Sequence, residues 1–269
     1  MTLIKDQFFD GERPLYESRD IRLERVTIGE GESGLKESRG VEAVECEFEG
    51  MYVLWECEDV VCRKCHFAAS DRAPIWYSRN LRLEDCIFDA QKAFREIDGL
   101  VLNNIKISDG IEVFWRCRDG QISDLQIENG HYPFFQCERL CIRQLWLKGK
   151  YAFQYAKNIE IHHAVLDTKD AFWNSENVTV YDSELKGEYL GWYAKNLRLV
   201  RCRISGTQPL CYCENLVLED CSFAPDADLA FEKSSVQATI IGSVTSIKNP
   251  LPGSIIEEKK TTCFRIGKG

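Results

Sequence analysis

The chain has 269 residues, of which 44% are hydrophobic and 29% are charged, and it contains few Gly and Pro residues. This composition is typical of a soluble globular protein and excludes a disordered or low-complexity chain. The formal net charge is −9, and no dense cluster of basic residues interrupts it. Nucleic acid and anionic membranes are therefore not expected as partners.

Residues 1–20 precede the first repeat and are predicted to form an N-terminal cap, with Phe8 and Phe9 covering the open core. No apolar run reaches the length of a signal sequence or a membrane span, so we expect a cytoplasmic protein. The 13 cysteines are then expected to be reduced and to act as small buried hydrophobic residues.

Residues 21–241 carry an internal repeat. The segment Asn80-Leu81-Arg82-Leu83-Glu84-Asp85-Cys86 returns as Asn196-Leu197-Arg198-Leu199-Val200-Arg201-Cys202. Its first apolar residue serves as a marker for about twelve repeats of 19–21 residues: Ile21, Val41, Val60, Leu81, Leu100, Gly120, Leu140, Ile159, Val178, Leu197, Leu216 and Val236.

Positions two, five and seven residues after the marker are apolar in almost every repeat, as in Leu83, Cys86 and Phe88. Alternation of apolar and polar residues is typical of β-strands, and the step from position two to position five indicates a corner between two short strands. Asn or Asp often precedes the marker, and both tolerate the backbone geometry of a corner. Repeats this short close a core only when they stack. The sequence therefore predicts an all-β fold, a single-stranded right-handed parallel β-helix, in which residues 242–269 form a C-terminal cap or tail.

Several segments resemble an uncharacterised bacterial family, domain of unknown function 3737, whose members are β-helices that contain cysteine and tryptophan. The segments that carry the resemblance are residues 9–13, 35–39, 169–183 and 187–192. The resemblance implies the fold and covers nearly the whole chain. It supplies no catalytic residues.

The third side of each repeat carries the candidate site. Five tryptophans stand five residues before the marker, a position with Lys36 and Arg95 in other repeats. The position four residues before the marker is mostly polar, whereas the position six residues before it is consistently apolar. If the tryptophans point inward, they fill the core; if a bulge turns them outward, they form an aromatic surface beside polar groups. The sequence leaves both orientations open.

An outward tryptophan row suits carbohydrate, because sugar rings stack on indoles while polar groups bind hydroxyls. The candidate ligand-binding residues are Trp55, Trp76, Trp115, Trp173, Asn174, Trp192 and Tyr193. The candidate catalytic carboxylates are Glu56, Glu96, Asp170 and Glu188, whose predicted spacing suits hydrolysis but would also arise in any solvated polar column. A glycosidase or polysaccharide lyase follows by analogy of fold only.

No metal or cofactor is predicted. Cys62 and Cys65 have a zinc-like spacing but fall in core columns, and the four histidines occupy unrelated repeat positions. Three functions remain open: binding or processing of a glycan or small molecule, a scaffold that binds a protein, and a structural homo-oligomer.

Overall fold

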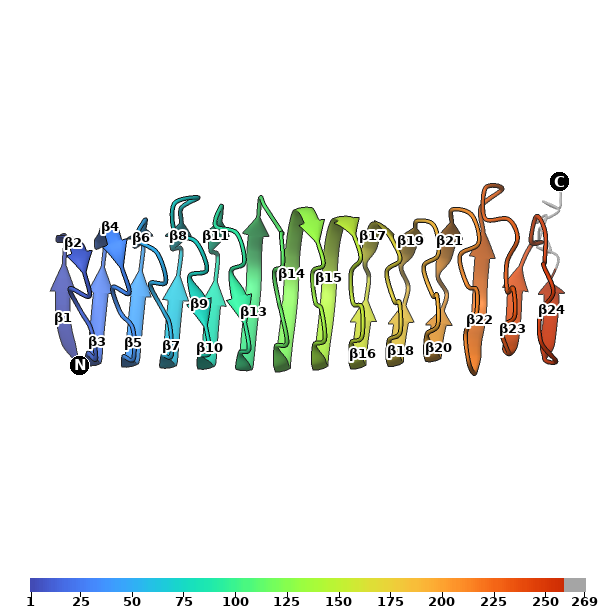
Figure 1. Cartoon of the computed structure of the whole chain (residues 1–269), viewed down its shortest axis with the longest axis horizontal. Coiled ribbons are helices and arrows are strands. Elements are labelled where there is room, and N and C mark those ends of the chain that lie inside the picture. The colour runs from blue at the N-terminus through green and yellow to red at the C-terminus, as the bar shows by residue number, and fades with distance from the viewer. Residues whose placement is uncertain (259–269) are drawn as a thin grey trace, which may run out of the picture.

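The computed structural model describes residues 1–258, which form a parallel β-helix of about 14 turns (Figure 1). These residues contain no helix that is long and apolar enough to cross a membrane. The strands are β1 (Thr2–Lys5), β2 (Phe8–Glu12), β3 (Arg19–Glu24), β4 (Thr27–Glu32), β5 (Arg39–Val44), β6 (Glu47–Phe48), β7 (Glu58–Arg63), β8 (His66–Phe67), β9 (Ile75–Trp76), β10 (Arg79–Glu84), β11 (Ile87–Phe88), β12 (Phe94–Arg95), β13 (Asp98–Ile107), β14 (Arg118–His131), β15 (Glu138–Lys150), β16 (Lys157–His162), β17 (Val165–Lys169), β18 (Glu176–Tyr181), β19 (Glu184–Lys186), β20 (Lys195–Val200), β21 (Arg203–Ser205), β22 (Leu216–Phe223), β23 (Val236–Ile241) and β24 (Ser254–Glu258).

Neighbouring coils pair in parallel in the register that the repeat predicts. Val60 pairs with Leu81, which pairs in turn with Leu100 on the next coil. The pairing continues beyond the predicted coils at both ends, where Thr2 of β1 pairs with Ile21 and Ile255 of β24 pairs with Ala238. These pairings add one coil at each end, so the solenoid is longer than the twelve coils that the repeat predicts.

The N-terminal segment forms the first coil of the described solenoid. Strands β1 and β2 pair with β3 and β4, and the Phe8 side chain is 63% exposed, so it does not plug the core. Phe9 is partly buried against the core. At the other end, Cys263, Phe264 and Ile266, which we expected in a cap or tail, lie outside the described residues.

The corners of each coil are made by residues in the left-handed backbone region. Asn80 (φ 56°), before the marker, and Asp85 (φ 55°), four residues after it, are examples. Asn and Asp adopt this region more readily than other non-glycine residues. The asparagines before the marker also form a ladder, in which Asn177 donates to Asn158 at 3.0 Å and Asn196 donates to Asn177 at 2.8 Å. The predicted corner role of this column is confirmed.

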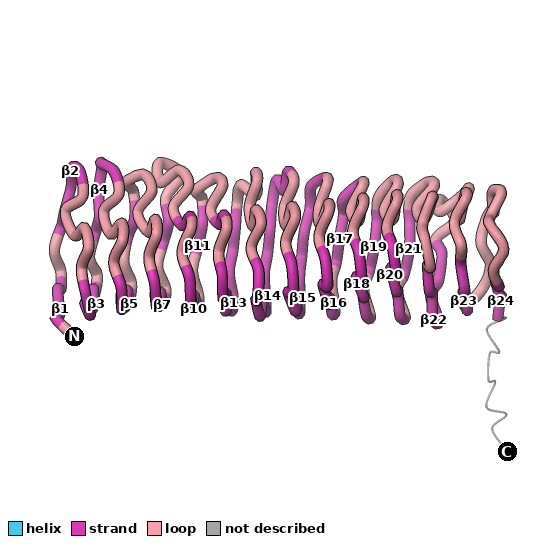
Figure 2. The backbone as a smooth tube through the Cα atoms, turned by 60° about the horizontal axis from the view of Figure 1, so that its bottom comes forward, coloured by secondary structure: helices cyan, strands magenta, loops and turns pink. Residues whose placement is uncertain are grey.

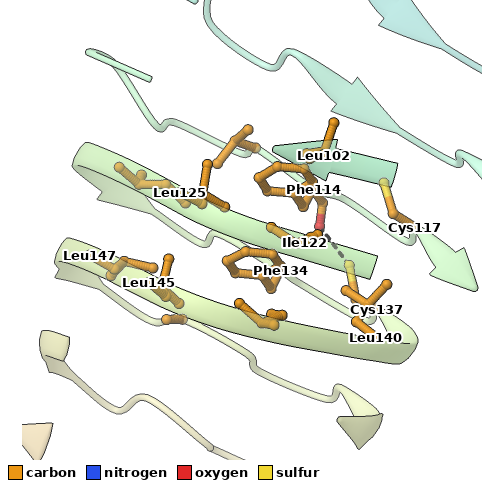
Figure 3. Close-up of a cluster of buried hydrophobic side chains, with 14 of the residues drawn as sticks. Leu102, Phe114, Cys117, Ile122, Leu125, Phe134, Cys137, Leu140, Leu145 and Leu147 are labelled. Carbon is orange, nitrogen blue, oxygen red and sulfur yellow. Dashed lines mark hydrogen bonds between the residues drawn. The ribbon is translucent and has the colours of Figure 1, made fainter. Parts of the chain in front are cut away.

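The core consists of like residues stacked on successive coils. Phe114 and Phe134 have ring centroids 4.7 Å apart and nearly parallel planes, and both are fully buried (Figure 3). Cys117 and Cys137 lie beside them, again buried. Such stacking follows from the parallel register, which places equivalent side chains about 4.8 Å apart.

The third side of the coil is mostly loop (Figure 2). Within residues 1–258 it carries only the short strands β9 and β12. Here the residue six before the marker and the residue three before it are buried, as Leu54 and Cys57 show. The intervening Trp55 is half-buried, and Glu56, in the left-handed region, is exposed. The bulged alternative is therefore the observed one, and the tryptophans point outward.

Candidate functional site

An aromatic strip runs along the third side of the solenoid. We define it as the half-buried rings of Trp55, Trp76, Trp115, Phe135, Trp173 and Trp192 together with the adjacent Tyr77, Tyr155, Tyr193 and Tyr212. Tyr77, Tyr155 and Tyr193 each expose more than two fifths of their surface, at 44%, 43% and 46%. The strip is a linear array because each coil contributes equivalent positions about 4.8 Å from the last.

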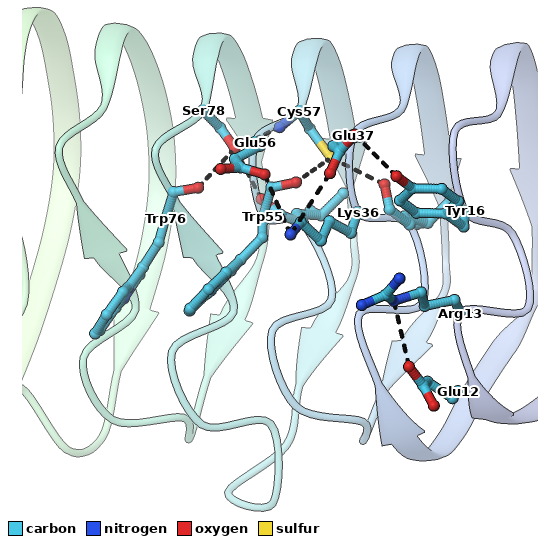
Figure 4. Close-up of polar contacts among 12 residues, drawn as sticks. Glu12, Arg13, Tyr16, Lys36, Glu37, Trp55, Glu56, Cys57, Trp76 and Ser78 are labelled. Carbon is cyan, nitrogen blue, oxygen red and sulfur yellow. Dashed lines mark hydrogen bonds and ion pairs between the residues drawn. The ribbon is translucent and has the colours of Figure 1, made fainter.

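In the N-terminal half of the strip, flat groups cover one another. Trp55 stacks on Trp76 with centroids 5.4 Å apart and planes inclined by 10° (Figure 4). The Arg95 guanidinium lies 4.2 Å from the Trp76 ring centroid and 5.2 Å from that of Trp115, which stacks in turn on Phe135. These cation–π and stacking contacts occupy ring faces, so this half offers mainly ring edges to a ligand.

In the C-terminal half the ladder of rings is interrupted on one side of Trp173, whereas Trp192 also contacts three tyrosine rings. Gln154, which is 3% exposed, takes the place of a ring between Phe135 and Trp173. Among the described rings, Trp173 stacks only on Trp192, with centroids 6.0 Å apart. Beside this pair lie the predicted ligand residues Asn174, which is half-buried, and Tyr193, which is exposed.

The indole N–H groups also distinguish the two halves. Those of Trp55 and Trp76 donate to the backbone carbonyls of Ala73 and Lys92, at 2.8 and 2.7 Å. Those of Trp173 and Trp192 are buried and have no hydrogen-bond partner among residues 1–258. A buried donor without a partner costs stability, and each such exception calls for an explanation.

Asp170 and Glu188 are brought together at the entrance to this half of the strip. The Asp170 backbone N–H donates to the Glu188 carbonyl at 2.9 Å, and Gln154 reaches the Asp170 carbonyl at 3.5 Å. Asp170 is only 6% exposed, whereas Glu188 is exposed. Burial raises the pKa of the Asp170 carboxyl, Lys169 opposes the rise, and Glu188 adds to it. A buried carboxyl of this kind holds its proton more strongly than a solvated one.

The other two candidate carboxylates have cationic neighbours. Glu56 lies 3.3 Å from the Lys36 ammonium, and Glu96 lies 3.7 Å from the Arg116 guanidinium (Figure 4 shows the first pair). Both are exposed and stand two coils apart in one column. They have the surroundings of ordinary surface ion pairs.

The cysteine columns are buried, as expected. Cys62 and Cys65 are at most 1% exposed, while His66 points outward between Glu47 at 2.6 Å and Asp89 at 2.9 Å. The zinc-like spacing of this segment therefore does not gather its side chains at one site. Burial raises the pKa of the Cys57 thiol to about 12, so this core thiol stays protonated and unreactive.

The structure shows two features of the outer surface that the sequence analysis does not predict. One is a groove along β10, β13 and β14, with cavities of about 360 and 520 Å³ that both contact Arg82, Val101 and Gln121. The other gathers the ligand atoms of Cys141, Glu160 and His162 within 4.8 Å of one another. The signal for the second feature was present, because these residues follow their markers by one, one and three positions on adjacent coils.

Solved structures resemble the chain in solenoid architecture alone. The A-module of mannuronan C-5 epimerase AlgE6 from Azotobacter vinelandii is 12% identical, with a TM-score of 0.39, over 96% of this chain and 81% of that one. The pentapeptide repeat protein HetL from the cyanobacterium Nostoc is 12% identical, with a TM-score of 0.25, over 85% and 89% of the two chains.

No curated protein matches the sequence significantly. One family does match, over residues 2–264, and its match includes every segment that carried the resemblance in the sequence. The chain therefore belongs to the family described as Protein of unknown function (DUF3737).

Proposed function

We propose that the chain binds an oligosaccharide along the C-terminal half of the aromatic strip. The observation that carries the proposal is the juxtaposition of Trp173 and Trp192, half-buried and next to the gap at Gln154, with the buried carboxyl of Asp170. Indole surface supplies stacking for the apolar face of a sugar ring, and a small number of placed polar groups fixes its orientation.

The shape of the strip favours a linear ligand over a single ring. Tyr193 stacks on Trp192 with a centroid distance of 5.9 Å, and Tyr212 lies 5.1 Å from Tyr193. Aromatic surface thus continues over several coils, and a chain of sugar units contacts more of it than a monosaccharide does. Asn174 and Glu188 on the same side offer hydrogen-bonding groups to hydroxyls.

Asp170 and Glu188 also give this site the residue types that glycoside hydrolysis uses. A carboxyl with a raised pKa can donate a proton to a leaving oxygen, and a second carboxylate can act as base or nucleophile. Asp170 is the acid in this reaction and Glu188 is its partner. Shortened products after incubation with a bound glycan identify a glycosidase, whereas unchanged glycan leaves a binding protein.

The experiment is a glycan panel probed with the full chain and with two variants. The wild-type chain is expected to retain one class of oligosaccharide, and Trp173→Ala and Asp170→Asn are expected to lose it. Arg198→Ala, on a different side of the coil, is the matched control and should bind like the wild type. Absence of any retained glycan, or equal loss in the control, would overturn the proposal.

A second candidate function is self-association at the N-terminal coil. Strands β1 and β2 pair on one side only among the described residues, and the end exposes Leu3 at 56% and Phe8 at 63%. Unpaired strand edges with apolar side chains favour pairing with another chain. Light scattering should then show a dimer that Leu3→Lys with Phe8→Lys converts to a monomer; a monomeric wild type excludes this function.

A further inference from the structure

Cys141 is unlike the other cysteines of the described chain. Eleven of the twelve described cysteines are buried, whereas Cys141 is partly exposed. It follows the marker of β15 by one position, and this column points outward on every coil. A small hydrophobic role in the core therefore does not account for it.

The parallel register places a carboxylate and an imidazole beside this thiol. Cys141 pairs directly with Glu160 on β16, and His162 stands two residues further along the same strand, on the same face. The ligand atoms of the three residues lie within 4.8 Å of one another. Two adjacent strands thus present sulfur, oxygen and nitrogen ligands at one point.

Neighbouring contacts hold the imidazole in place. The ring of His162 stacks on Tyr181 of the next coil, with centroids 4.7 Å apart and planes inclined by 12°. Its Nε2 atom lies 2.6 Å from the Glu160 carboxylate. This orientation directs Nε2 toward the two other ligand atoms, so the side chain is already positioned in the described structure.

We propose that Cys141, Glu160 and His162 form a zinc site with one open coordination position. Zn²⁺ takes thiolate, imidazole and carboxylate ligands, and three protein ligands with one open position are typical of zinc sites that bind water or substrate. On binding, the thiol proton passes to solvent, the neutral imidazole carries its proton on Nδ1 in place of Nε2, and the Glu160–Nε2 hydrogen bond gives way to two bonds to the metal. The thiolate, carboxylate and Zn²⁺ charges sum to zero, which limits repulsion by Arg143, in register with His162.

The test uses the full chain after treatment with a chelator. Zinc is titrated in competition with a fluorescent indicator, and Co²⁺ is added separately as a spectroscopic probe. We expect a 1:1 zinc complex and, with Co²⁺, a thiolate-to-metal charge-transfer band. Cys141→Ser should remove the band. Both Cys141→Ser and His162→Gln should weaken zinc binding by more than the roughly 10–100-fold that is typical when a residue hydrogen-bonded to a metal ligand is replaced.

His131→Gln is the matched control, because it removes another surface imidazole without touching the site, and it should bind zinc like the wild type. The three substituted positions, Cys141, His162 and His131, are at the surface, so circular dichroism should show unchanged folding in each variant. The proposal is overturned if the wild type competes no better than the Cys141→Ser variant. It is also overturned if the cobalt band persists in that variant or if the control loses as much affinity.

Discussion

The backbone N–H of Asp170 donates to the backbone carbonyl oxygen of Glu188 at 2.9 Å, which places these two acidic residues side by side on adjacent coils. Only one of the two is buried. The pair therefore combines a carboxyl that resists ionisation with one that solvent reaches, next to Trp173 and Trp192.

Asp170→Asn is expected to raise the free energy of unfolding at neutral pH. Burial lifts the Asp170 pKa above its ordinary value of 3.8, so stability falls as pH rises from that value through the folded-state pKa. Asn removes the charge and tolerates the left-handed backbone (φ 50°) at this position. Denaturant unfolding at pH about 4 and about 7 checks this; a variant less stable than the wild type at neutral pH contradicts it.

A gain of stability in Asp170→Asn together with a loss of glycan binding would be the signature of a residue kept for function. Loss of binding with loss of stability would instead indicate a structural role. The two measurements on one variant therefore separate these explanations.

Leu199→Ala should lower the free energy of unfolding by about 2–5 kcal/mol, because it leaves a cavity in a stack that neighbouring coils hold apart. Leu199 is 1% exposed. Arg198 on the same strand faces outward and pairs with Glu219, so Arg198→Ala should change stability by no more than about 1 kcal/mol. Similar urea midpoints for the two variants would reject the assigned strand faces.

His66 should stabilise the fold more at low pH than at high pH. Burial lowers its pKa, but the hydrogen bonds and charges of Asp89 and Glu47 outweigh this and raise it above 6.5. Its contribution is therefore fully present below about pH 6.5 and is lost as pH rises through the folded-state pKa. The stability difference between wild type and His66→Gln should shrink between pH about 5 and about 8; a constant difference contradicts this.

The core thiols should stay reduced and unreactive in the native state. Cys46, Cys65 and Cys86 are at most 2% exposed, and coil spacing of about 4.8 Å exceeds the usual disulfide Cβ separation of about 3.8 Å. In a Cys263→Ser background, which removes the cysteine outside the described residues, a thiol reagent should label Cys141 first. Peptide mass spectrometry decides this, and a Cys46–Cys65 crosslink would contradict it.

The fold was predictable from sequence because its coils have nearly constant length. Markers such as Val60, Leu81 and Leu100 align in the structure as they do in the sequence. The terminal coils were not predicted because Thr2 and the segment before Ser254 lack the apolar marker that identifies the others. Their pairing depends on the neighbouring coil, which a local pattern does not show.

The candidate site was only partly predictable. The outward direction of the tryptophans depends on left-handed residues such as Glu56 and Tyr77, and residues other than Asn and Asp give no signal for that geometry. The difference between Trp76, whose face is covered by Arg95, and Trp173, next to Gln154, depends on ring orientations between coils. Sequence supplies the residue types in the strip but not which of their faces are free.

Calorimetric titration of the retained oligosaccharide into Trp173→Ala and Trp146→Ala tests the central claim most directly. Both variants remove one half-buried indole, but Trp146 pairs with Val165 on another side of the coil, in the ladder of β15 and β17. The account predicts that Trp173→Ala weakens binding by at least about 1 kcal/mol, the scale of one aromatic contact, while Trp146→Ala binds like the wild type. Unchanged affinity in Trp173→Ala, or an equal loss in Trp146→Ala, would contradict it.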